Sequence, residues 1–88
     1  MAMYQLKYRR HARNYLARLP RKIKSRIVDK LHEIKENPDD PNLDVEKLKG
    51  DLGYRFRVGQ YRIIYTRHKE QLIIEVVKIR PRGDIYKR

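Results

Sequence analysis

The chain contains no cysteine and no tryptophan, it has only three histidines, and none of its apolar runs is long. Without cysteine, the protein has no disulfide, no thiolate metal site and no cysteine nucleophile. The histidines (His11, His32 and His68) lack the spacing of metal ligands, so we expect neither a metal nor another cofactor. The longest apolar run, residues 72–74, is far shorter than the roughly 20 residues of a membrane span, and the N-terminus lacks the apolar segment of a signal peptide. We therefore expect a cytoplasmic protein without a membrane partner.

The scarcity of serine and glycine excludes two further kinds of catalytic site. Ser25 is the only serine and lies within a predicted helix, so the sequence does not support a Ser-His-Asp arrangement for acyl transfer. The four glycines stand singly at predicted turns, which excludes a glycine-rich loop that cradles a nucleotide phosphate.

Positive charge, in contrast, is abundant. The 88 residues carry a net charge of +12 and are expected to form one domain, residues 1–88. Residues 1–28, 29–51 and 52–88 contribute +9, −4 and +7. Such a field favours a polyanionic partner, and charge alone leaves RNA, DNA and an acidic protein equally open.

The first half of the chain predicts a strand and two helices. Residues 3–8 alternate weakly between polar and apolar, as in a strand. A short apolar stripe with helical spacing follows and is interrupted by Pro20. Four apolar residues then recur at spacings of four, four and three, which predicts a helix of about four turns that ends before Asn37. These residues are Ile23, Ile27, Leu31 and Ile34.

The second half predicts a sheet. Residues 43–50 are expected to be irregular or to form a helical turn, and strands are predicted over 52–58, 61–67 and 72–79 as an antiparallel meander. The last strand is almost entirely aliphatic, which is typical of a strand covered on both faces, and the first strand should pair beside it. The predicted fold is α+β, with an N-terminal strand and two helices packed on one face of a mostly antiparallel four-stranded sheet, in the order β-α-α-β-β-β.

The hairpin within this sheet carries three arginines that are expected to share one face. If Gly59-Gln60 is a two-residue turn, Arg57 lies opposite Arg62, and Arg55 lies opposite Ile64. Like charges that face each other across a pair of strands repel, whereas a polyanion on that face would hold them together. Because an arginine fork can bind two phosphate oxygens at once, the cluster predicts a phosphate-binding surface.

Further basic residues flank the hairpin, and the C-terminal segment adds a phenol. Tyr86 could stack on a base, donate a proton or simply cover the core. The flanking basic residues are Lys47 and Lys49 before the hairpin, and Arg80, Arg82 and Lys87 after it.

These features resemble the RelE group of the RelE/ParE toxin superfamily, over nearly the whole chain. The resemblance lies in the order of elements, in Lys47 to Gly50, in the basic and aromatic pattern of residues 54–65, and in Arg80 placed six residues before Tyr86. It implies a metal-independent endoribonuclease that cuts mRNA in the ribosomal A site. In that reaction the ribose 2′-hydroxyl attacks the adjacent phosphate and leaves a 2′,3′-cyclic phosphate and a 5′-hydroxyl.

The resemblance also implies roles for individual residues. Arg62 and Arg80 match family arginines, and Tyr86 matches a C-terminal tyrosine that would act on the leaving 5′-oxygen. Arg55 and Arg57 stand where a well-studied relative has lysines, and arginine does not lose its proton, so we expect them to stabilise charge rather than accept a proton. Glu46 occupies the place of a glutamate base in some relatives and is the candidate base.

The resemblance implies partners too. They are a RelB-like antitoxin from the neighbouring gene, the mRNA, and the ribosome with its rRNA; an operator DNA would be reached only through the antitoxin complex. Two alternatives stay open: a ParE-like toxin that poisons DNA gyrase without cutting nucleic acid, and a catalytically inactive RNA-binding module. The shared fold does not distinguish them.

Overall fold

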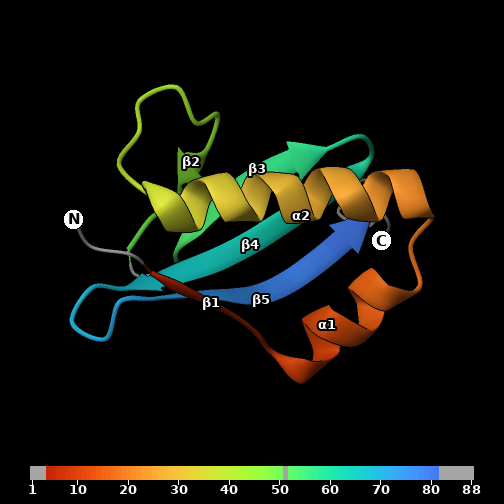
Figure 1. Ribbon diagram of the computed structural model, residues 1–88, viewed down its shortest axis with the longest axis horizontal. Coiled ribbons are helices and arrows are strands. Elements are labelled where there is room, and N and C mark those ends of the chain that lie inside the picture. Colours follow the sequence, from red (N-terminus) through yellow and green to blue (C-terminus); the bar gives the residue numbers. More distant parts are fainter. Residues whose placement is uncertain (1–3, 51, 82–88) are drawn as a thin grey trace.

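A computed structural model describes residues 4–50 and 52–81 of the chain. In these residues a five-stranded sheet runs in the order β1-β5-β4-β3-β2; the longer of two helices lies across one of its faces, and the shorter lies beside the β1–β5 edge (Figure 1). The strands are β1 (Gln5–Tyr8), β2 (Glu46–Lys47), β3 (Tyr54–Val58), β4 (Tyr61–His68) and β5 (Ile73–Pro81). The α+β class predicted from the sequence is therefore confirmed.

The helices begin and end where proline and apolar spacing indicated. Helix α1 (Arg10–Ala17) ends before Pro20, whose fixed φ places it at the N-cap of α2 (Arg21–Glu36). Helix α2 buries Ile27, Leu31 and Ile34, and ends at Glu36, with Asn37 as its C-cap directly before a proline. No helix in the described part of the chain is long and apolar enough to cross a membrane.

The sheet has one strand more than the sequence predicted. Residues 43–50 were expected to be irregular or helical, but Glu46 and Lys47 pair with Arg55 and Tyr54 of β3 and form the two-residue strand β2. Two residues cannot display an alternating pattern, which explains why this strand was missed. The count of four strands was therefore wrong. The predicted pairing of β1 beside β5 is confirmed, and it is parallel.

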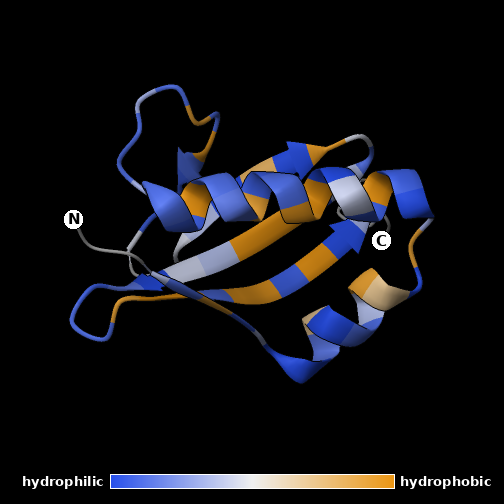
Figure 2. Cartoon of the chain, in the orientation of Figure 1, coloured by the Kyte–Doolittle hydropathy of each residue, from blue (hydrophilic) through white to orange (hydrophobic). Residues whose placement is uncertain are grey.

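The core lies between the helices and the sheet. It contains Phe56, Ile63, Tyr65, Ile74 and Ile79 from the strands, with exposures of 2% or less, and the buried faces of both helices. Figure 2 shows hydrophobic stretches along β4 and β5 behind α2. On the opposite face the alternate residues of β5 are only half-buried, so the prediction that this strand is covered on both faces was wrong.

Candidate phosphate-binding face

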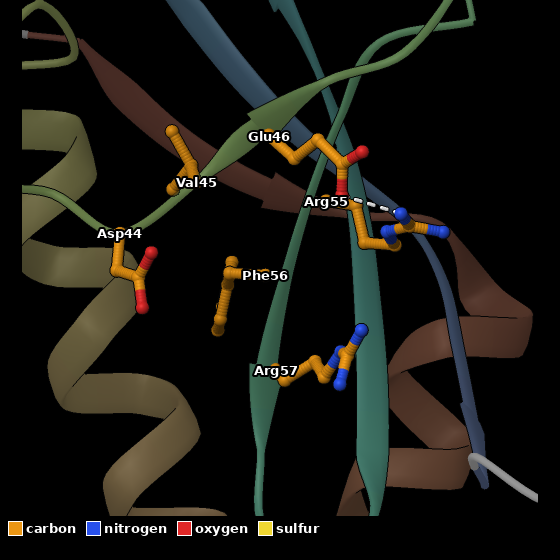
Figure 3. A pocket seen from close by; sticks show the side chains of 6 residues that line it. All are labelled: Asp44, Val45, Glu46, Arg55, Phe56 and Arg57. Atoms are coloured by element: carbon orange, nitrogen blue, oxygen red, sulfur yellow. Dashed lines mark hydrogen bonds and ion pairs between the residues drawn. The ribbon is translucent and has the colours of Figure 1, made fainter.

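Three arginines from three adjacent strands form one row across the sheet face opposite the core, which we call the uncovered face because none of the described helices packs on it. Arg57 of β3 lies opposite Arg62 of β4, and Arg62 lies opposite Arg80 of β5. We call this set the arginine row. The predicted hairpin register is confirmed at every position from Val58–Tyr61 to Arg55–Ile64. Figure 3 shows Arg55 and Arg57 projecting from the same side of β3, while Phe56 points the other way.

A β-bulge in β5 brings Arg80 into this row. The pairing Tyr65–Val76 is followed by Ile64–Lys78, which leaves Val77 as an extra residue without a partner in β4. Burial shows the same change, because Ile74 and Val76 are buried before the bulge and Ile79 after it. Without the extra residue, strict alternation would turn Arg80 towards the helices. The bulge also turns Lys78 onto the uncovered face.

The arginine row has no acidic partner among residues 4–50 and 52–81. Directly opposed residues on neighbouring strands have Cβ atoms about 5 Å apart, so the central Arg62 is repelled from both sides. Its Nε atom is buried and finds no hydrogen-bond acceptor in the described structure. A buried donor without an acceptor is unfavourable. The row therefore has the electrostatics of an anion site.

Glu46 of β2 lies beside the row and is bound to Arg55. Arg55 Nη2 donates a hydrogen bond to Glu46 Oε1, and this pair is drawn in Figure 3. The hydrogen bond and charge of Arg55, followed by the charges of Arg57 and Arg62, lower the pKa of Glu46 below its usual 4.5. Glu46 is therefore ionised near neutral pH and can accept a proton there.

A pocket of about 260 Å³ lies at this edge of the sheet (Figure 3). It brings together the candidate base and two of the predicted arginines. Its lining consists of Asp44, Val45, Glu46, Arg55, Phe56 and Arg57.

Other predicted site residues are not placed in the row. The pairing of Lys47 with Tyr54 puts Lys47 on the helix-covered side of the sheet, because Tyr54 stacks there on the buried Tyr65. Lys49 is exposed in the bend that follows β2. The remaining three, Arg82, Tyr86 and Lys87, lie outside the described residues.

Two further residues lie on the uncovered face, Ile64 and Lys78, and neither was predicted as part of the site. They lie opposite each other, and each is two residues along its strand from Arg62 or Arg80. The hairpin register was a signal that could have placed Ile64, since it already set this residue opposite Arg55. No sequence signal placed Lys78, because the bulge that turns it outward falls within an almost uniformly apolar segment.

A second polar cluster occupies the other end of the same face. His68 ends β4, and its Nε2 lies 3.2 Å from Glu75 Oε1 and 3.1 Å from Thr66 Oγ1. Arg9 Nε donates to the other oxygen of Glu75 at 3.2 Å. Desolvation of Glu75 opposes these contacts, but its hydrogen bonds with His68 and Arg9 prevail and lower its pKa. No group of three or more metal-ligating side chains occurs in the described part of the chain.

Comparison with known proteins gives a consistent family relationship. Residues 6–86 match the model of the family described as ParE toxin of type II toxin–antitoxin system, parDE. A candidate RelE-like toxin protein of Escherichia coli is 32% identical over 85 residues, which is 94% of this chain and 90% of that protein.

Solved structures show the same fold. The archaeal RelE–RelB complex of Pyrococcus horikoshii matches with a TM-score of 0.79 and 29% identity, over 92% of this chain and 97% of that chain. The RelB–RelE antitoxin–toxin complex of Methanococcus jannaschii matches with a TM-score of 0.70 and 29% identity, over 91% of this chain and 94% of that chain. The intact RelBE toxin–antitoxin complex of Escherichia coli has a TM-score of 0.74 over 89% of this chain and 94% of that chain, but at 22% identity it shows the fold alone.

Proposed function

The chain belongs to the ParE toxin family of type II toxin–antitoxin systems and is a RelE-like toxin, and we propose that it is a metal-independent endoribonuclease that cuts mRNA in the ribosomal A site. The observation that carries this proposal is the arginine row, whose three cations lack an acidic partner in the described structure. A protein that acts only by binding another protein has no need of such a row. Cleavage of mRNA in the A site would stop translation.

In the proposed reaction the arginine row binds the scissile phosphate. The ribose 2′-oxygen attacks phosphorus, the bond from phosphorus to the 5′-oxygen breaks, and the products are a 2′,3′-cyclic phosphate and a 5′-hydroxyl. Charge on the non-bridging oxygens rises in the pentavalent transition state. Arg57, Arg62 and Arg80 can donate hydrogen bonds to these oxygens, and stabilisation of developing charge of this kind is often the largest catalytic effect.

Two protons move in this reaction. Glu46, held ionised by Arg55, is the proposed acceptor of the proton from the 2′-hydroxyl. Its lowered pKa makes it a weak base, so we expect positioning by the row to account for most of the rate. Tyr86, which lies outside the described residues, is the proposed donor to the leaving 5′-oxygen. The further basic side chains of Lys47, Lys49, Arg82 and Lys87 are proposed to bind RNA away from the scissile phosphate.

The proposed partners follow from the family. A RelB-like antitoxin, encoded by a neighbouring gene, would inhibit the toxin and bring it to operator DNA only indirectly. Two of the matched structures are complexes of RelE with RelB, which supports such a partner. The mRNA and the rRNA of the A site would be the nucleic-acid partners, and the site of action would be the cytoplasm.

The test maps 5′ ends on a translated mRNA after addition of the purified toxin. We expect cuts at the A-site codon with wild type, and loss of at least about 100-fold in rate with Arg80→Ala, in line with removal of one donor to transition-state charge. Tyr86→Phe should slow cleavage by roughly 10- to 1,000-fold if the phenol is the acid. A wild type that produces no cuts and no cyclic phosphate would contradict the proposal.

The matching family model favours one second candidate, because it describes ParE toxins. Under that alternative the protein would poison DNA gyrase and leave RNA intact. Supercoiling by purified gyrase, measured with and without the toxin, separates the two functions. Inhibited supercoiling without mRNA cuts would support the gyrase alternative.

A further inference from the structure

An apolar side chain lies among cations on the uncovered face. Ile64 projects there between Arg55 on β3 and Lys78 on β5, with which it is paired on either side. It is only half-buried, although most branched aliphatic residues of the sheet lie in the core. Along β4, Ile64 stands two residues from Arg62, which corresponds to about 7 Å. A nucleotide whose phosphate is bound by the arginine row would therefore reach it.

The two cations beside Ile64 differ in their availability. Arg55 is bound to Glu46, so its charge is already neutralised. Lys78 has no acidic partner within residues 4–50 and 52–81. It reaches this face only because of the bulge at Val77, and bulges are common where a side chain next to an active site must be redirected.

We propose that Ile64 and Lys78 form a nucleobase subsite that sets which base lies beside the cleaved phosphate. This inference rests on the proposed nuclease function. The Ile64 side chain would pack against the face of the base, as apolar side chains do against unstacked bases. The Lys78 ammonium donates hydrogen bonds but accepts none, so it favours a base edge that carries an acceptor.

This chemistry selects between two classes of base. Guanine and uracil carry a keto oxygen where adenine and cytosine carry an amino group. The amino group is a donor and would face the donor of Lys78 without a hydrogen bond. The subsite should therefore prefer keto bases to amino bases, and one hydrogen bond of ordinary strength corresponds to about fivefold.

The simpler explanation of Ile64 is that it covers the aliphatic parts of Arg55 and Lys78, without any contact to RNA. That explanation predicts an effect on stability and none on base preference. The ratio of cutting beside keto and amino bases therefore distinguishes the two explanations, whereas total activity does not.

The experiment uses the full chain and the mapped cuts on translated mRNAs that differ only in the base beside the cleaved phosphate. We expect wild type to cut beside keto bases about fivefold faster than beside amino bases. Lys78→Met, which keeps the length of the side chain, should bring this ratio close to 1, with a smaller loss in total cutting. Lys7→Met is the matched control, because Lys7 is on the same face but far from the row. It lies on β1 opposite Glu75 of β5, in the distant polar cluster. This control should leave the ratio unchanged.

Binding provides a second measurement that does not depend on catalysis. Short 2′-deoxy oligonucleotides of uracil and of cytosine cannot be cleaved by this route, and their affinities can be measured by fluorescence anisotropy. We expect wild type to prefer the uracil oligonucleotide, and both Lys78→Met and Ile64→Thr to weaken its binding, with the fold of each variant checked by thermal melting.

The outcomes separate the two proposals. If wild type cuts mRNA but shows no keto preference, or if Lys78→Met keeps that preference, the subsite is refuted and the nuclease function stands. If wild type neither binds nor cuts RNA, both proposals fail.

Discussion

Replacing Arg62 by methionine should stabilise the protein while removing its activity. Arg62 stands between Arg57 and Arg80, and its buried Nε has no acceptor in the described structure. Two unit charges about 6 Å apart repel by about 0.7 kcal/mol in water, so the two neighbours together contribute roughly 1.5 kcal/mol. Methionine keeps the unbranched stem and removes the charge. For a domain of this size, such a gain raises Tm by about 6–12 °C.

The assay is thermal unfolding of wild type and Arg62→Met at low and at high salt, together with the mRNA cleavage assay. The gain in Tm should be largest at low salt and shrink as salt screens the repulsion. Cleavage should fall by about 100- to 1,000-fold, because one donor to the transition-state charge is lost. Residues that serve a function at the expense of stability produce this combination.

Arg55→Met is the matched control on the same face. Arg55 already has Glu46 as its partner, so its removal abolishes an attraction and should not raise Tm. Repulsion within the row is refuted as a cost to stability if Arg62→Met melts at or below the wild-type temperature at low salt, or if its gain in Tm is the same at every salt concentration.

Further predictions concern the turn before β3 and two acidic residues. Gly53→Ala should lower Tm more than Gly50→Ala does. A Cβ at Gly53 (φ +100°) would lie 2.4 Å from a backbone oxygen of β4, whereas a Cβ at Gly50 (φ +63°) would meet nothing within 4 Å. Equal melting temperatures of the two variants would contradict this close approach. If Glu46 is the base, its lowered pKa places the acidic limb of the cleavage rate below about pH 4.5, so a rate that still rises between pH 5.5 and 8 would exclude it. Asp39 accepts hydrogen bonds from Arg67 at 2.8 and 3.0 Å, which lower its pKa. The stability that ionised Asp39 contributes is complete above its usual pKa of 3.8 and is lost as pH falls through its lowered pKa in the folded protein. The difference in Tm between wild type and Asp39→Asn should therefore become smaller in acid. A difference that stays constant with pH would refute this role of the Asp39–Arg67 pair.

Much of the fold could be predicted because short-range signals agreed. The spacing of Ile27, Leu31 and Ile34 identified α2, and the two-residue turn at Gly59 set the whole register of the hairpin. Strand β2 could not be predicted, because its two residues are held by pairing with β3 and not by their own pattern. Tertiary pairing overrode local preference there.

The candidate site was predictable only where the alternation of strands is regular. Arg55, Arg57 and Arg62 follow from the hairpin alone. Arg80 entered through family resemblance, because its orientation depends on the bulge at Val77. In a run of aliphatic residues, an extra one changes no visible pattern, so neither the bulge nor the outward turn of Lys78 could be deduced.

The parallel pairing of β1 with β5 has a consequence for the order of folding. Gln5 lies beside Ile73, so nearly the whole chain must be closed into a loop before these strands can meet, whereas β3, β4 and β5 join neighbours in sequence. We expect β1 to dock last because its one neighbour is so distant in sequence, and we expect both short edge strands, β1 and the two-residue β2, to detach early. The arginine row lies wholly on the other three strands, so the cationic surface should persist after the first step of unfolding.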